Sequence, residues 1–225
     1  MHNLELYIND KKKLFSEHHF FQKLYDPQIE LSKKLEFLPY LAHFIMSFGD
    51  INKYVIPFRS PKDQYEKIIN THAEEDAHHW PWYIDDLKAL GLDKNQSITQ
   101  TLEFLWSEKL APSRELSYKL ISLLSNQSAI IRYIVIEVME ATGNVTFKVL
   151  KNITHTLNPP LKFCGQLHLS HETGHTITED ENLFEKYTFS DQDRLNAQNI
   201  INECFDAFSY FMDQLNDNLN QLLEE

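Results

Sequence analysis

The stretch His168-Leu169-Ser170-His171-Glu172-Thr173-Gly174-His175 places three histidines and a carboxylate within eight residues. If this stretch is helical, His168, Glu172 and His175 stand at positions i, i+4 and i+7 and share one face of the helix. His171 borders the same face. Imidazole nitrogens and a carboxylate oxygen arranged in this way are suitable ligands for a first-row transition metal. Because one helix face cannot surround an ion, the other ligands must come from other helices.

A second group of histidines and carboxylates lies in the segment 62–90, which predicts a helix that ends at Gly91. Its inward stripe, in steps of three or four residues, runs through Ile68, His72, Glu75, His79, Tyr83, Leu87 and Leu90. Buried charge is costly unless it is paired or bound to a metal, so the polar members of this stripe are candidate ligands. Glu75 and His79 are the preferred pair, with His72, Asp76 and His78 as alternatives. Glu75 and His78 also have the Glu-x-x-His spacing of four-helix di-iron proteins.

The segment 127–157 predicts one long helix, in which Glu137 and Glu140 interrupt a run of isoleucine, valine and methionine. An acidic residue in such a run is a candidate bridging ligand, and Glu140 is preferred over Glu137. The full candidate set is Glu75, His79, Glu140, His168, Glu172 and His175. This mixture of carboxylates and imidazoles suits iron or manganese better than a cysteine-rich structural zinc site.

The remaining pattern is also helical, because the chain has only five glycines and eight prolines between long periodic segments. Helices are predicted over residues 3–25, 27–48, 62–90, 113–125, 127–157, 161–178 and 191–225, with a short helix starting near Ser97. Pro39 is expected to bend or split the second of these, Gly49 to end it, and Pro81 to kink the third. We therefore expect a single all-α domain of about seven helices over residues 1–225.

Composition excludes several classes of function. The formal net charge of −12 disfavours nucleic acid as a partner. The most apolar stretch, 130–139, is short and carries Arg132 and Glu137, so no membrane-spanning helix is expected. Cys164 and Cys204 do not form a CxxC motif and are interpreted as buried thiols of a reducing compartment. No secretory signal is visible at the N-terminus, and a cytoplasmic location is expected.

The motif order resembles the heme-oxygenase-like di-iron oxidase superfamily. The resemblance rests on His168-x-x-x-Glu172-x-x-His175, on the preceding glutamate inside a long helix, and on the earlier helix with glutamate and histidine, and it spans roughly residues 25–220. It implies a seven-helix up-and-down fold shared with heme oxygenase, TenA thiaminases and pyrroloquinoline-quinone synthase. It also implies a non-heme centre of two iron ions, or of iron and manganese, that activates O₂.

The same resemblance assigns roles to the candidate ligands. Glu75 and His79 would come from the first ligand helix, Glu140 would bridge the ions, and the 168–175 motif would complete the second ion. The reactions known in the superfamily are N-oxygenation, oxidative C–C cleavage and decarboxylation of small organic substrates. His72, Asp76 and His78 compete for the first-helix positions, so that choice stays open.

Two other classes of function remain as alternatives. One is a metal-free protein on the same scaffold, either TenA-like or a binder of small ligands, in which the histidines contact the ligand. The other is an effector that binds a protein partner through an exposed apolar patch. A homodimer is an open alternative to a monomer. His18 and His19 lack a ligating neighbour in the sequence and are interpreted as surface or half-buried side chains.

Overall fold

The computed structural model describes residues 4–174, 184 and 187–224. These residues form helices and connections without any strand, so the predicted all-α class is confirmed. The expected count of about seven helices is wrong, since the described residues form a larger number of helical segments. The difference arises because several segments predicted as single helices are divided.

The α-helices are α1 (Leu4–Ser16), α2 (His19–Leu24), α3 (Leu31–Lys34), α4 (Ala42–Asp50), α5 (Gln64–Asp76), α6 (Trp80–Ala89), α7 (Ile98–Leu105), α8 (Ala111–Leu124), α9 (Ala129–Thr154), α10 (Gln166–Gly174) and α12 (Asp191–Glu224). Two 3₁₀ helices, η1 (Leu38–Leu41) and η3 (Glu108–Leu110), and a π-helical turn, η2 (Ile51–Val55), connect them.

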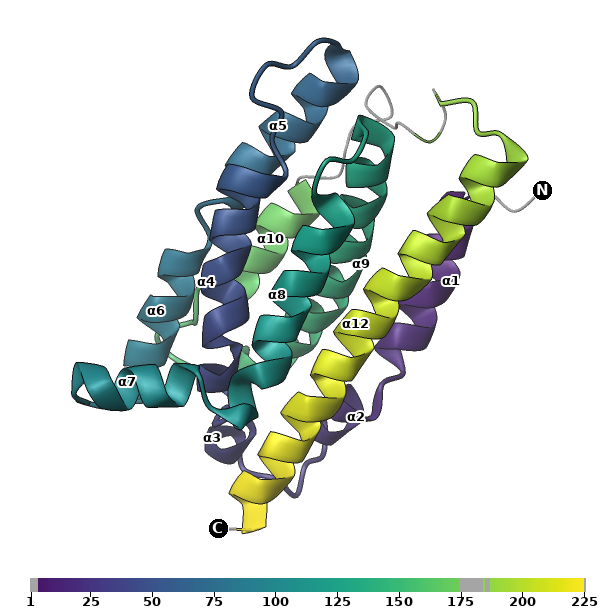
Figure 1. Cartoon of the computed structure of the whole chain (residues 1–225). Coiled ribbons are helices and arrows are strands. Elements are labelled where there is room, and N and C mark those ends of the chain that lie inside the picture. Colours follow the sequence, from purple (N-terminus) through teal and green to yellow (C-terminus); the bar gives the residue numbers. More distant parts are fainter. Residues whose placement is uncertain (1–3, 175–183, 185–186, 225) are drawn as a thin grey trace.

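Helix α9 forms the centre of the molecule. It packs against α1, α5, α8, α10 and α12, and Figure 1 shows α8, α9 and α12 running side by side. Ile134, Val135 and Val138 of α9 are fully buried, and they belong to one continuous cluster of buried apolar side chains. The predictions of one long helix within 127–157 and of a last helix beginning near Asp191 are both confirmed.

The N-terminal third of the chain is more divided than its apolar pattern indicates. The predicted helix 3–25 breaks at His18, whose side chain caps α2 by accepting a hydrogen bond from the Phe20 amide. The predicted helix 27–48 splits into α3, η1 and α4, as expected from Pro39, which lies in the first turn of η1. Gly49 does not end α4, which continues to Asp50 and then widens into the π-helical turn η2.

The break between α5 and α6 has the largest effect on the site. Helix α5 ends at Asp76, and α6 begins at Trp80 with Pro81 in its first turn, where a missing N–H costs no hydrogen bond. The chain is therefore not one kinked helix over 62–90. On α5 the buried polar positions are His72 and Asp76, one turn apart, and His79 is buried in the connection.

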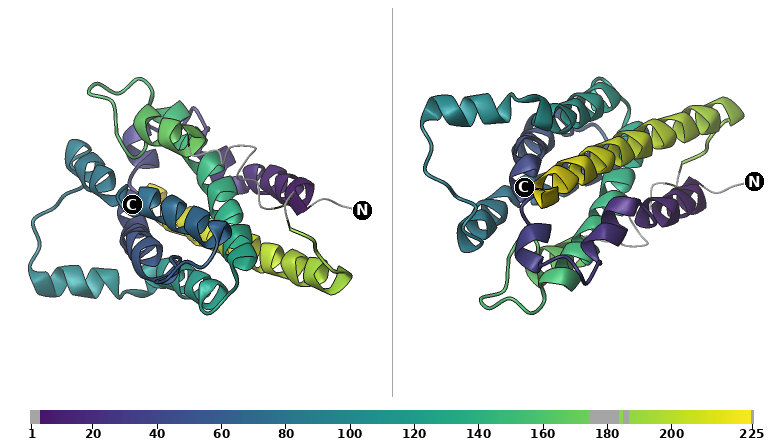
Figure 2. Two further views of the ribbon diagram at one scale, coloured as in Figure 1. Left: turned by 90° about the horizontal axis from the view of Figure 1, so that it is seen from above. Right: turned by 90° about the horizontal axis from the view of Figure 1, so that it is seen from below.

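Helix α7 lies at the periphery, on the opposite side of the molecule from α1 (Figure 2). Ser97 and Gln100 form a capping box at its start, close to the predicted start of this helix. It contains no buried residue, and Ile98 and Leu102 are exposed. Among the described residues, no helix combines the length and the apolar character that a membrane crossing requires.

Candidate metal centre

The first half of the centre joins α5 to the middle of α9. The Nε2 atom of His72 lies 3.3 Å from an Asp76 carboxylate oxygen and 3.2 Å from a Glu140 carboxylate oxygen. His72 and Asp76 are buried, and Glu140 is about one-quarter exposed. Two atoms that each lie about 2.1 Å from a shared ion, at tetrahedral to octahedral angles, are roughly 3.0–3.4 Å apart. Both distances from His72 fit ligands of one ion, and the ligand atoms of the three side chains all lie within 4.8 Å of one another.

The charge of this group also favours a cation. Burial by itself lowers the pKa of His72, but hydrogen bonds to Asp76 and Glu140 and the charges of both carboxylates outweigh it and raise that pKa to about 11. Two carboxylates at the edge of an apolar interior are stable only with positive charge between them. In the metal-free protein the imidazolium of His72 supplies that charge.

The second half of the centre joins the α5–α6 connection to α10. The His79 ring stacks on Trp82, with ring centroids 4.8 Å apart and planes inclined by 13°. The His168 ring meets His79 edge-on at 5.0 Å. His171, which is exposed, lies 5.9 Å from the His79 ring. Three of the predicted ligand candidates are thus neighbours in space although they come from two distant segments.

The orientation of His168 is set by its surroundings. Its ring is 2% exposed and packs against Phe147 and Phe163, at centroid distances of 3.8 and 4.5 Å. Its Nδ1 atom lies 3.1 Å from the Phe163 carbonyl oxygen. Because a carbonyl oxygen can only accept, Nδ1 donates to it, and Nε2 is the ring atom that would bind a metal. This arrangement is typical of metal-binding histidines.

The segment before α10 is held by Asp86, a residue that the sequence interpretation overlooked. Asp86, on α6, is 2% exposed, and its carboxylate accepts hydrogen bonds from the amides of Lys162 and Cys164, at 2.7 and 2.8 Å. Burial raises the pKa of Asp86, and these amide donors act against that rise. The sequence did contain a signal for this role, because Asp86 adjoins the apolar stripe of Tyr83, Leu87 and Leu90.

Gly165 explains how closely the chain can turn into α10. A Cβ atom at this position would lie 1.9 Å from the Leu161 carbonyl oxygen, far inside any allowed contact. The Thr154 hydroxyl, at the end of α9, donates to the Cys164 carbonyl oxygen at 2.8 Å. The segment 161–165 is therefore held by both α6 and α9. Because it leads directly into α10, it positions the helix that carries His168.

The other sequence candidates are distributed as follows. Glu75 and His78 are exposed and are not part of the group formed by His72, Asp76 and Glu140. Glu172 lies in α10, in a stretch whose side chains the structure does not describe, and His175 lies outside the described residues.

Glu137 is partly buried, and burial raises its pKa, while a hydrogen bond from Tyr133 acts in the opposite direction. The charges of His72, Glu5 and Lys12 also act on Glu137. Glu140 has a carboxylate oxygen beside His72 and is grouped with His72 and Asp76, whereas Glu137 is not.

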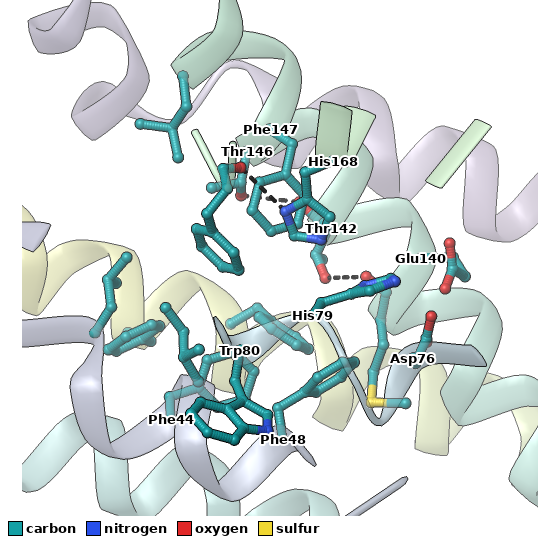
Figure 3. A pocket seen from close by; sticks show the side chains of 18 of the residues that line it. Phe44, Phe48, Asp76, His79, Trp80, Glu140, Thr142, Thr146, Phe147 and His168 are labelled. Atoms are coloured by element: carbon teal, nitrogen blue, oxygen red, sulfur yellow. Dashed lines mark hydrogen bonds between the residues drawn. The ribbon is translucent and has the colours of Figure 1, made fainter. Parts of the chain in front are cut away.

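A cavity of about 90 Å³ adjoins the centre (Figure 3). Asp76, His79, Glu140 and His168 contribute to its wall, so both halves of the centre face one space. The rest of the described wall is mostly apolar and comes from η1, α4, α6, α9, α12 and the segment before α10: Leu41, Phe44, Ile45, Phe48, Gly49, Trp80, Met139, Thr142, Gly143, Thr146, Phe147, Leu150, Phe163, Phe208, Phe211 and Met212. A substrate in this cavity would be largely shielded from water.

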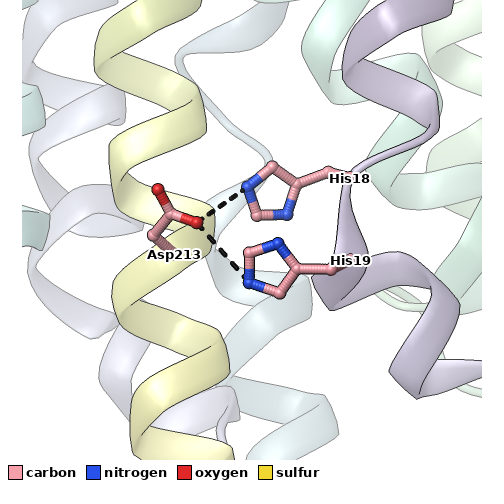
Figure 4. Close-up of side chains that lie close together, drawn as sticks. All are labelled: His18, His19 and Asp213. Atoms are coloured by element: carbon pink, nitrogen blue, oxygen red, sulfur yellow. Dashed lines mark ion pairs between the residues drawn. The ribbon is translucent and has the colours of Figure 1, made fainter.

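A separate group of His18, His19 and Asp213 lies between α2 and α12 (Figure 4). The Nε2 atoms of the two histidines lie 3.2 and 3.5 Å from the same Asp213 oxygen. Burial lowers the pKa of His18, and the charge of His19 adds to this effect, so the neutral ring is favoured. Since His18 Nδ1 accepts from the Phe20 amide, the single proton of that ring is on Nε2 and donates to Asp213. The contact fastens α2 to α12, and a metal bound by this group would have to displace that proton, as it would have to displace the proton of His72.

Comparison with known proteins adds no family assignment to this geometry. No protein-family model matches the sequence, and no curated protein matches it.

Proposed function

We propose that this protein is a non-heme dinuclear metal oxygenase or oxidase with a heme-oxygenase-like fold, which uses two iron ions, or iron and manganese, and O₂ to act on a small organic substrate. The observation that carries the proposal is the convergence of carboxylates and imidazoles from α5, the α5–α6 connection, α9 and α10 at one cavity. A mixed set of nitrogen and oxygen ligands suits these metals. The ions, when bound, would supply the electrons and Lewis acidity needed to react O₂ with the substrate.

The described geometry supports a revised ligand set. His72, Asp76 and Glu140 would hold one ion, because their ligand atoms lie within 4.8 Å of one another and the group adjoins the cavity. His79 and His168 would hold the other ion, together with the predicted ligands Glu172 and His175. His72 and Asp76, which were alternatives in the sequence, are preferred over Glu75 because they are buried beside Glu140.

The remaining residues of the site would position and shield the centre. The Phe163 carbonyl fixes the His168 ring, and Asp86 fixes the segment that carries Phe163. Phe147, Phe163 and Trp80 keep water away from the cavity wall, which strengthens electrostatic interactions inside it.

The test is uptake of O₂ by protein loaded anaerobically with ferrous iron. Wild type should consume O₂ rapidly on mixing with air-saturated buffer, whereas His168→Ala and Glu140→Gln should react no faster than free ferrous iron. His155→Ala, at an exposed histidine just beyond α9, should behave as wild type. Circular dichroism confirms that each variant is folded. Equal O₂ uptake by all four folded proteins would refute the proposal.

A second candidate function is supported by the wall of the cavity. Its mostly apolar lining would bind a small ligand without any metal, as in a TenA-like protein or a metal-free binding protein. Under this alternative, protein purified from iron-supplemented medium would lack first-row metals and would still bind an apolar ligand. Stoichiometric iron in that preparation would exclude it.

A further inference from the structure

The cavity beside the candidate centre is polar in one region only. Its ionisable lining residues are Asp76, His79, Glu140 and His168, which belong to the two halves of the centre. Thr142 and Thr146 also line it, but their hydroxyls donate to the carbonyl oxygens of Val138 and Thr142, both at 2.9 Å. Their donor protons are thus used within α9. Their oxygens can still accept, but every ionisable side chain that lines the cavity belongs to the centre.

The wall away from the centre offers no partner for a charge. Phe44, Phe208, Phe211, Met212 and Leu41 form it, and no lysine or arginine lines the cavity among the described residues. A charged group moved from water to such a surface loses its hydration without gaining a counter-ion. By contrast, each methylene group that is buried against this wall makes binding more favourable, because apolar surface leaves water.

We infer that the substrate is a hydrocarbon-rich molecule with one polar group, bound with that group toward the centre and an uncharged aliphatic or aromatic part among Phe44, Phe208 and Phe211. This inference rests on the proposed function for the identity of the centre, but the binding orientation follows from the cavity alone. Sugars, nucleotides and molecules with a charge at each end do not fit this wall. The apolar wall suits aliphatic and aromatic groups alike, and comparison of the alkyl alcohols with benzyl alcohol distinguishes them.

Binding of a series of primary alcohols to the full chain tests the inference. Ligand-observed NMR should show affinity rising roughly fourfold for each added methylene group from 1-butanol to 1-hexanol. The matched charged probe, 6-amino-1-hexanol, should bind at least about tenfold more weakly than 1-hexanol. Benzyl alcohol reports whether an aromatic ring is accepted equally well. Equal affinity for 1-hexanol and 6-amino-1-hexanol, or no dependence on chain length, would overturn the inference.

Two substitutions on α12 localise the binding. Phe208 lines the cavity, whereas Phe205 is buried on the same helix and is not among the lining residues. Phe208→Leu enlarges the cavity and should raise the ratio of 1-octanol to 1-hexanol affinity at least about threefold. Phe205→Leu, with the same change in size, should keep the wild-type ratio. An identical ratio in both variants would contradict the assigned site.

Iron content, measured in the same samples, separates this inference from the proposed function. Iron-loaded protein that does not discriminate among the alcohols would overturn the inference and leave the metal centre standing. Protein that follows the alcohol series but binds no iron would support the assigned ligand class and refute the oxygenase proposal.

Discussion

At the scale of single residues, the position of one carboxylate decides the ligand set on α5. A continuous helical stripe permits either Glu75 or Asp76 one turn after His72, because both spacings lie near 3.6 residues. In the structure Asp76 is 3% exposed and lies beside His72, whereas Glu75 is exposed. The choice depends on how α5 packs against α9, which periodicity alone does not determine.

Asp76→Asn therefore tests the revised assignment. Replacing a ligating carboxylate by an amide of the same shape should weaken binding of ferrous iron by at least about 100-fold, more than the loss of an outer-shell partner. Glu74→Gln, at an exposed carboxylate two positions earlier, should leave binding unchanged. Equilibrium dialysis with metal analysis measures both. Similar iron binding by the two variants would show that Asp76 is not a ligand and would contradict the revised ligand set.

Asp86 gives a second prediction at this scale. Asp86→Asn turns one of two acceptors into a donor that faces the amide of Lys162 or Cys164, leaving a buried N–H without a partner. The expected loss of unfolding free energy is about 1–3 kcal/mol. Asp85→Asn is the matched control, because Asp85 is exposed and pairs with the Lys162 side chain at 2.6 Å. Urea denaturation should show a lower midpoint for the Asp86 variant and no change for the Asp85 variant. A common midpoint would rule out this role for Asp86.

At the scale of helices, Arg132 connects α9 to the end of the π-helical turn η2. Its guanidinium donates to the carbonyl oxygens of Val55, Ile56 and Pro57, and it lies 4.0 Å from the centroid of the Phe58 ring. These donors satisfy carbonyl groups that the ending helix leaves without backbone partners. The sequence showed Arg132 as the charge in an apolar stretch but did not show this partner.

Removing the connection should destabilise the fold. Arg132→Ala is expected to lower the unfolding free energy by about 2–3 kcal/mol, because buried carbonyl groups lose their donors and the stacking on Phe58 is lost. Arg132→Lys should recover only part of this loss, since an ammonium group cannot donate in the same planar geometry. Arg59→Ala, at an exposed arginine in the same connection, should have no effect in the same denaturation assay. Equal stability of the Arg132→Ala and Arg59→Ala variants would refute the stabilising role of Arg132.

The helices also show what the sequence could predict. Helix α9 was predictable because its apolar stripe is long and has no proline, and the last helix because its stripe and acidic N-terminus agree. The breaks at His18 and at 77–79 were not, since the end of a helix depends on capping contacts and on packing that the apolar pattern does not encode. Pro39 and Pro81 marked two of the break regions, but they did not indicate that whole turns would be lost.

At the scale of the whole molecule, the fold brings His79 of the window 72–79 and His168 of the window 168–175 to one cavity beside Glu140. The residue types and the participating helices were predictable from spacing and from charge within apolar stripes. The exposure of Glu75 and His78, the stacking of His79 on Trp82 and the anchoring by Asp86 were not, because they depend on the angle between α5 and α6. The apolar wall of the cavity likewise required the packing of α4 and α12.

An anomalous-scattering crystal structure of the iron-loaded protein, collected at the iron absorption edge, tests the central claim most directly. The account predicts two peaks between α5, α9 and α10, one bounded by His72, Asp76 and Glu140 and the other beside His79 and His168. No peak in that region, or iron found only at His18, His19 and Asp213, would contradict it.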